Sequence, residues 1–297
     1  MAQPNHTPRL LQTEEALTVP FCLIDDAYAH LNPRARCYES IKRLSDSEVI
    51  ALALFQQLRG VESERSFLRD AQRFFSHLFP GVVGLHPSSF HRRMRKLRRF
   101  LEPLRRDVLC EMVGDPETLL VDSTLLSVLH PLLRSLRARA SPVRRGYVGV
   151  RSASTFCEAA PHLRHQWGPS LLRTHPLQNV ADVCLTEELI DEAALGDGVA
   201  RRLLGDLAYR SEGLKEPLTE IGILLVTEPS ERRHGLRQRV EIAISSLKRV
   251  FGLSETLATT LVGLATRIAA KIAAYTYAFA VNRMLGRPQG RIKELWA

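Results

Sequence analysis

The sequence predicts an α/β domain preceded by an all-helical domain. Up to about residue 115 the apolar residues recur at helical spacing, whereas from Thr118 the chain contains short apolar runs typical of strands. Helical segments separate and follow these runs, and this alternation is typical of α/β domains. The runs are TLLVDSTLLSVL (118–129), RRLLGD (201–206) and IGILLVTEP (221–229). We therefore expect a mobile N-terminus at 1–20, a helical domain at 21–115 and an α/β domain at 116–297.

Two helices are expected in the first part of the helical domain. Ser45 followed by Glu48 forms a capping box, which predicts that a helix starts just before the apolar run VIALALFQQL. A second helix is expected from Glu64 to Leu78, because the following Phe-Pro-Gly at 79–81 would stop it.

A third helix, expected at 90–109 after a cap at Ser88 or Ser89, is strongly basic. A basic helix that follows another helix across a turn can enter a DNA groove, so we expect a helix-turn-helix-like DNA-binding unit. The alternative is a solvated basic face of an ordinary helix. The cations are Arg92, Arg93, Arg95, Lys96, Arg98 and Arg99.

Composition limits the class of protein. The formal net charge of +9 suits a polyanionic partner, because each phosphate neutralised by Lys or Arg releases counterions. The five cysteines are scattered without a CxxC pair, so neither a disulfide framework nor a zinc site is expected. The most apolar stretch, Leu257 to Met284, is interrupted by three cations and predicts a buried helix pair rather than a membrane span.

Three acidic residues have neighbourhoods that suit a metal site. Asp122 and Asp206 each end a short apolar run, which is a common way to fix a carboxylate at the end of a buried strand. Glu241 lies near the start of a predicted helix and shares one face with Arg237 and Lys248. Carboxylates flanked by cations can hold a metal ion while the cations bind phosphate. Taken singly, each aspartate is more often a turn former or a helix cap.

The pattern Tyr-x2-Arg-x3-Glu-x6-Lys is characteristic of one protein family. Here its positions are His234, Arg237, Glu241 and Lys248, with the spacing kept and His in place of Tyr. The segments GDLAYRSEGL and FGLSETLATTLVGLATRIAAKIAAYTYAFAVNRMLG also look like parts of that family. Over nearly its whole length the chain resembles the DDE transposases encoded by bacterial insertion sequences.

The resemblance implies an RNase H-like catalytic domain with Asp122, Asp206 and Glu241 as the catalytic triad. These carboxylates would hold two Mg²⁺ or Mn²⁺ ions, and Lys248, Arg237 and His234 would bind phosphates near the cleavage point. The implied partner is double-stranded DNA, both the terminal repeats of the element and the target. The resemblance further implies a homodimer in the synaptic complex and a cytoplasmic, nucleoid-associated location.

Residues 132–176 do not fit the resemblance. They have no clear period, and the second and third strands of the family are not recognisable there. Back-translated codons for 157–176, read in a shifted frame, can encode a hairpin of the family's kind. Those for 145–155, read in the other shifted frame, can encode the string WVRWGSFSVY, so we hypothesise a frame-shifted stretch. The alternative is a divergent loop or insertion. In an RNase H-like sheet this hairpin flanks the strand of the first aspartate, and its loss would bare a sheet edge.

Three functions therefore remain open. The first is a transposase that cuts and joins element ends, and the second is a catalytically dead DNA-binding remnant of one. The third, a stand-alone RNase H-like nuclease, would share the carboxylates but lack the Arg-x3-Glu-x6-Lys helix.

Close to the second aspartate, Tyr209 is expected to be a packing residue and Gly205 to permit a tight turn.

Overall fold

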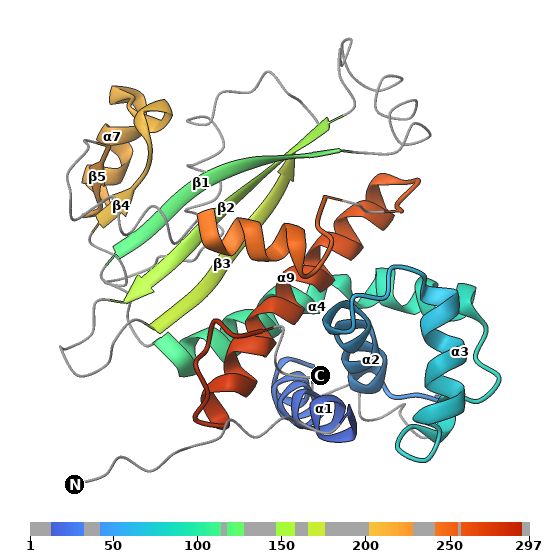
Figure 1. The fold of residues 1–297 in the computed structure, drawn as a ribbon. Coiled ribbons are helices and arrows are strands. Elements are labelled where there is room, and N and C mark those ends of the chain that lie inside the picture. The colour runs from blue at the N-terminus through green and yellow to red at the C-terminus, as the bar shows by residue number, and fades with distance from the viewer. Residues whose placement is uncertain are drawn as a thin grey trace, which may run out of the picture.

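The structure is a computed structural model that places a mostly helical body beside one β-sheet (Figure 1). No helix in the part of the chain that it describes is long and apolar enough to cross a membrane. It describes residues 13–32, 42–113, 118–127, 147–157, 166–175, 202–227, 241–254 and 257–292.

The helices and strands alternate in the order that the sequence predicts, helices first. The longer described helices are α1 (Thr13–Leu31), α2 (Asp46–Leu58), α3 (Glu64–Phe74), α4 (Pro87–Val113), α7 (Glu212–Glu220) and α9 (Leu261–Met284). The strands are β1 (Thr118–Ser127), β2 (Tyr147–Cys157), β3 (Gln166–His175), β4 (Arg202–Leu204) and β5 (Leu224–Val226). Short 3₁₀ turns lie at Pro80–Val82 and Leu207–Tyr209.

The first helix begins earlier than expected. α1 starts at Thr13, within the segment 1–20 that we expected to be mobile. The reason is a set of apolar residues at helical spacing, of which Ala16, Leu17 and Ile24 are fully buried. The helix therefore belongs to the core, and residues 1–12 lie outside the described part.

The capping box before α2 is confirmed. The Ser45 hydroxyl accepts a hydrogen bond from the Glu48 backbone N–H at 3.0 Å, and the Glu48 carboxylate accepts one from the Ser45 N–H. All residues from Val49 to Leu58 are buried, so α2 lies in the centre of the helical body.

The boundaries of α3 and α4 differ from those expected. α3 ends at Phe74 rather than Leu78, because the chain turns so that Phe75 and Phe79 are both buried. α4 begins at Pro87 rather than after a serine cap, since proline lacks an N–H and suits the first turn of a helix.

The sheet has the order β3-β2-β1-β4-β5 and mixes two kinds of pairing. β1 pairs antiparallel with β2, and β2 pairs antiparallel with β3. On its other side β1 pairs parallel with β4, which pairs parallel with β5. The runs at 118–129, 201–206 and 221–229 thus supply β1, β4 and β5, as predicted from their composition.

The sheet contains two strands from the stretch 132–176, where none could be recognised in the sequence. β2 and β3 both lie inside this stretch, and β2 pairs with β1 along the whole length of β1. Ladder hydrogen bonds join backbone groups, so pairing does not require the side chains that the family has at these positions. Pro169, which cannot donate to a ladder, lies in β3 at the edge of the sheet, where proline is tolerated.

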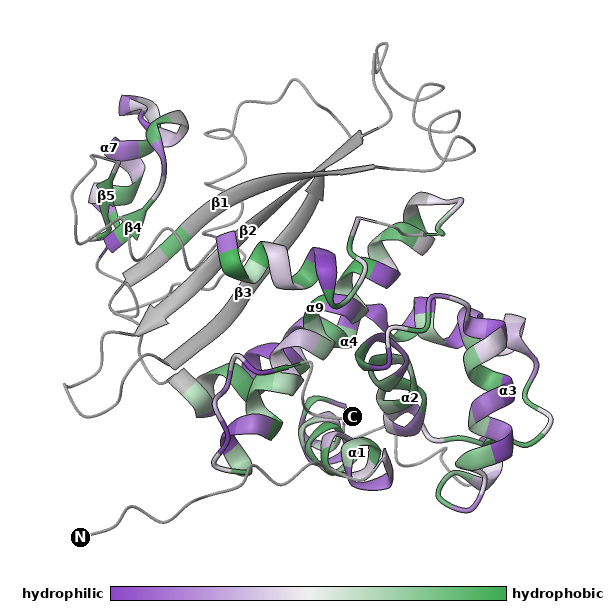
Figure 2. Ribbon diagram, viewed as in Figure 1, coloured by the Kyte–Doolittle hydropathy of each residue, from purple (hydrophilic) through white to green (hydrophobic). Residues whose placement is uncertain are grey.

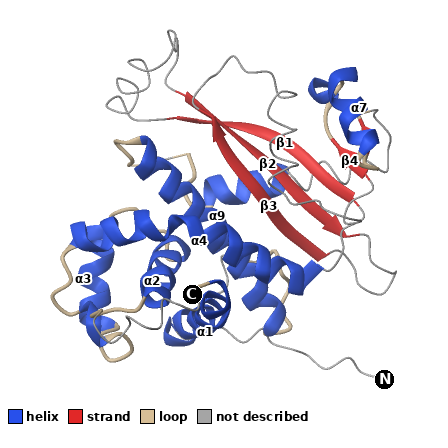
Figure 3. Cartoon of the chain, turned by 180° about the vertical axis from the view of Figure 1, so that it is seen from behind, coloured by secondary structure: helices blue, strands red, loops and turns tan. Residues whose placement is uncertain are grey.

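The apolar C-terminal stretch forms one helix, α9, rather than the expected pair. α9 packs against α4, α2 and α1, and its residues share one buried cluster with theirs (Figures 1 and 3). The C-terminal helix therefore completes the core of the N-terminal helices. Figure 2 shows its apolar character.

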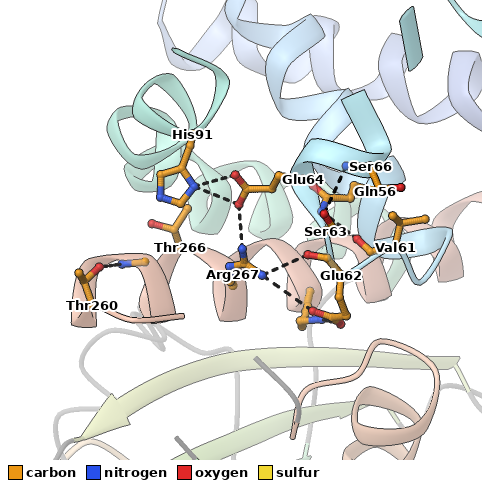
Figure 4. Close-up of polar contacts among 12 residues, drawn as sticks. Gln56, Val61, Glu62, Ser63, Glu64, Ser66, His91, Thr260, Thr266 and Arg267 are labelled. Carbon is orange, nitrogen blue, oxygen red and sulfur yellow. Dashed lines mark hydrogen bonds and ion pairs between the residues drawn. The ribbon is translucent and has the colours of Figure 1, made fainter. Parts of the chain in front are cut away.

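Two cations that interrupt the apolar pattern of α9 connect distant segments, and Figure 4 shows one of them, Arg267. The side chain of Lys271 is 1% exposed and pairs with Glu62 at 2.6 Å, and its ammonium also donates to the backbone carbonyl of Phe251. One turn earlier, Arg267 donates to Glu64 at 3.2 Å, and Glu64 contacts the His91 ring at 2.8 Å. These contacts tie α9 to α3, α4 and the link between α2 and α3.

We expect an asymmetry between the two halves of the buried pair. Glu62→Ala removes the carboxylate that balances the buried ammonium and should lower the free energy of unfolding by about 3 to 5 kcal/mol. Lys271→Met fills the same space and leaves a carboxylate whose side chain is 29% exposed, so the loss should be smaller. The measurement is urea unfolding followed by circular dichroism.

The double variant Glu62→Ala/Lys271→Met provides the control. It removes the buried charge altogether and should be more stable than Glu62→Ala alone. A double variant that is less stable than either single variant would show that the buried charge is not what destabilises Glu62→Ala.

Candidate functional site

The two aspartates follow matching positions of two neighbouring parallel strands, Asp122 within β1 and Asp206 just after β4. The printed register pairs Leu119 with Leu203 and Leu120 with Leu204. Asp122 is two residues beyond Leu120, and Asp206 is two residues beyond Leu204. Paired strands lie about 4.8 Å apart, so the backbones of the two aspartates lie in one neighbourhood. Asp122 does not end its strand as expected, because β1 continues to Ser127, whereas Asp206 does follow the end of β4.

The helix of Glu241 packs on the same two strands. Ile244 shares a small buried cluster with Leu120 and Leu204, the residues that precede the aspartates by two positions. Glu241 lies three residues before Ile244 in the helix at 241–249, which places it about one turn from this contact. The predicted triad therefore comes from three segments that meet at one point of the sheet.

The described side chains of the site differ in exposure. Asp206 is half-buried and Glu241 is exposed, while Lys248 is half-buried one turn after Ile244. The backbone of Asp122 is placed in β1, but its side chain lies outside the description. His234 and Arg237, expected to bind phosphate, also lie outside the described residues.

The donor chemistry of the predicted triad suits a hard divalent cation. Carboxylate oxygens are the ligands that Mg²⁺ and Mn²⁺ prefer. Among the side chains that the structure describes, no group of three or more His, Cys, Asp or Glu is close enough to hold a metal ion. That set does not include Asp122, so the three-carboxylate arrangement remains a prediction.

The packing of the Tyr209 ring explains why the residue before Asp206 is a glycine. Tyr209 is 1% exposed, which confirms its predicted packing role. A Cβ added at Gly205 would lie 2.9 Å from a ring carbon of Tyr209, so glycine is needed there for close approach to the ring. The expected tight turn is not the reason, because Gly205 is not among the glycines with positive φ.

The basic residues of α4 differ in exposure and in ion pairing. Arg92, Arg95 and Lys96 are exposed, in keeping with a surface that can meet phosphate. Arg93 instead pairs with Asp46 at 2.6 Å at the start of α2. Arg93 therefore has a structural role in the helical body, and its contact with DNA stays a prediction.

The Asp46 carboxylate that pairs with Arg93 has several other hydrogen-bond partners. Burial raises the pKa of Asp46, but hydrogen bonds from Lys42 and Arg93 outweigh burial and hold the pKa below its usual value. The same carboxylate accepts a hydrogen bond from the Tyr28 hydroxyl at 3.1 Å. Asp46 therefore links α1, α2 and α4.

Sequence analysis missed a second row of cations. Arg65, Arg69 and Arg73 of α3 are all exposed and recur every fourth residue, a spacing that places them on one helix face. The same spacing is visible in ERSFLRDAQRF at 64–74, but the denser cluster of basic residues in α4 drew the prediction instead.

Compared with known proteins, the chain matches no protein-family model and no curated protein sequence.

Substitution of Gly205 by alanine should destabilise the protein by about 1 to 3 kcal/mol, because the buried Tyr209 ring has no room to move away. Gly213→Ala in α7 is the matched control. Its added Cβ would meet only the Ser211 hydroxyl at 3.6 Å, and alanine favours a helix. Thermal unfolding of both variants checks this, and equal melting temperatures would contradict the packing argument.

Proposed function

We propose that this protein is a DDE transposase of the insertion-sequence type, which binds the ends of its element and catalyses metal-dependent cleavage and transfer of DNA strands. The proposal extends to an RNase H-like fold for the domain that contains the sheet. It rests on the residue pattern of the sequence and on the way the described backbone arranges three acidic positions.

The observation that carries the proposal is the small cluster of Leu120, Leu204 and Ile244. Each of these residues is two or three positions from one of the predicted acids, and they come from a central strand, its parallel neighbour and a late helix. Residues about 80 and 120 positions apart in the chain thus meet where a shared metal site requires them.

The strand order also supports the proposed fold. The resemblance implies that the strand of the first aspartate lies between a hairpin and the strand of the second aspartate. β1 lies between the β2–β3 pair and β4, which precedes Asp206. This agreement is independent of any one side chain, because it rests on backbone pairing.

Asp122, Asp206 and Glu241 would hold the two divalent cations by their carboxylate oxygens. When bound, such ions lower the pKa of a water nucleophile and stabilise the leaving oxygen of a phosphodiester. The carboxylates would fix the ions beside the scissile phosphate. Asp122 lies in a paired strand, Asp206 follows one and Glu241 lies on a helix packed against both. This limits their motion, which matters because a displacement of about 1 Å can lower the rate about a hundredfold.

Lys248 is suited to bind a phosphate beside the triad. It lies seven residues after Glu241, two turns along the same helix face, and four residues after Ile244. Its ammonium can bind a phosphate oxygen as a point charge, whereas Arg237 would bind in a bidentate manner. The proposed DNA path therefore runs along the helix at 241–249.

The rival reading is a DNA-binding remnant without catalysis. It predicts duplex binding with no Mg²⁺-dependent cleavage. Replacing residues 145–176 by the hairpin that the shifted frames encode would restore cleavage if the frame-shifted stretch is the cause. Translating the gene's codons 130 to 180 in all three frames tests whether that hairpin is encoded.

The triad makes a direct prediction. Asp122→Asn, Asp206→Asn and Glu241→Gln should each lower Mg²⁺-dependent cleavage at least about a hundredfold. The substrate is a duplex with the DNA that flanks this coding sequence, and cleavage is measured on a denaturing gel.

Glu212→Gln is the control, since this carboxylate lies in the first turn of α7 and its side chain is 83% exposed. It should leave cleavage unchanged. Wild-type activity in any triad variant would remove that residue from the site. Cleavage that disappears in all three variants but continues on unrelated duplexes in the wild type would favour a stand-alone nuclease.

A further inference from the structure

The helical body contains a tighter helix-turn-helix than the one between α3 and α4. α2 ends at Leu58 and α3 begins at Glu64, so five residues join them, whereas twelve separate α3 from α4. Gly60 in this short connection has φ +64, a conformation that favours glycine. Short turns containing glycine are typical of helix-turn-helix motifs, in which the second helix enters the DNA groove.

The outward face of α3 is made of arginines. Phe67, Leu68 and Ala71 are buried, which defines the face of α3 that packs on the core. At about 100° per residue, Arg65, Arg69 and Arg73 lie within an arc of about 80° on the opposite side. Figure 2 shows hydrophilic residues along this helix.

These arginines are available for a partner. Within the described part of the chain, none of the three forms an ion pair, although Asp70 is exposed nearby. Arg73 lies over the ring of Phe74 at 5.2 Å, and Phe74 is itself 55% exposed. The arc of α3 that holds the arginines therefore carries three cations without an ion pair among the described side chains, and Asp70 lies beside this arc.

The acidic residue at the start of α3 points the other way. Ser63 caps the helix, and Glu64 turns inward to His91 of α4 and Arg267 of α9 (Figure 4). These bonds attach the first turn of α3 to the body, so its arginines are presented on a fixed helix. Both views place α3 at the outer edge of the molecule, away from the sheet (Figures 1 and 3).

We propose that α3 is the helix that reads base edges in the major groove of double-stranded DNA, with Arg65 and Arg69 as the reading residues. This inference rests on the proposed function, because it names the surface that would recognise the element ends. Arginine binds guanine in a bidentate manner, the commonest specific contact in the major groove. The exposed cations of α4 then bind phosphates, which position the protein without reading sequence.

Duplex RNA fits this face less well than DNA. The major groove of A-form RNA is too deep and narrow for side chains to read, whereas that of B-DNA admits an α-helix. The face also has only one exposed apolar side chain, Phe74, so it lacks the apolar centre of a protein interface.

The test separates base reading from charge. The full-length protein is used to select preferred duplexes from a library with a randomised central segment, and its affinities for a selected and an unselected duplex are compared. Arg65→Lys/Arg69→Lys keeps the charge but loses the guanidinium fork, so the ratio of the two affinities should fall at least about tenfold. The dependence of affinity on salt should stay unchanged.

Arg92→Lys/Arg95→Lys in α4 is the matched control and should keep the affinity ratio. If the α3 variant keeps it too, α3 does not read bases, while the proposed function stands. Should the wild type bind no duplex, both proposals fail. Tighter binding of structured RNA than of duplex DNA would overturn DNA as the partner. The substituted residues of α3 are exposed, so folding should be unchanged. Matching circular dichroism spectra of variant and wild type check this.

Discussion

The buried ammonium of Lys271 is the contact on which most of the architecture depends. A charge that is 1% exposed is tolerated only with close partners, and here they come from two distant segments. Glu62 belongs to the link between α2 and α3, and Phe251 follows the helix of Glu241. The position of α9 therefore fixes the positions of the link between α2 and α3 and of the segment at Phe251. A single side chain thus couples the proposed DNA-reading helix to the segment that carries the third acid.

The helix at 241–249 joins two cores. Ala243 and Leu247 belong to the large helical cluster, whereas Ile244 belongs to the small cluster on the sheet. Residues on adjacent faces of one helix thus contact different bodies, which fixes both its position and its rotation. Glu241 is one turn from the sheet contact, so its place relative to the strands is set by packing on both sides. A carboxylate on such a helix is far better defined than one on a loop.

Sequence reasoning succeeded where a local pattern determines structure. The capping box at Ser45 and the apolar runs that became β1, β4 and β5 are examples, since each depends on residues a few positions apart. It failed where partners are distant in sequence. Arg93 could not be distinguished from its exposed neighbours without knowing that Asp46 lies opposite, and α9 was divided because the charges of Arg267 and Lys271 suggested a break. The joint position of the acids was predictable only from the combined motif.

The stretch between the first two acids shows what strand pairing can and cannot guarantee. β2 lies along β1 from Thr118 to Ser127, so the backbone of Asp122 is paired with Ser152 whatever side chains β2 carries. Side chains decide the register, because a slip by one residue moves every side chain to the other face. The irregularity between Ser152 and Ser154 of β2 is a change of this kind within one strand pair. A metal site needs its ligands placed to a fraction of an ångström, whereas a ladder needs only continuous backbone. The frame-shifted stretch that we hypothesise would therefore be compatible with the fold and still able to abolish catalysis.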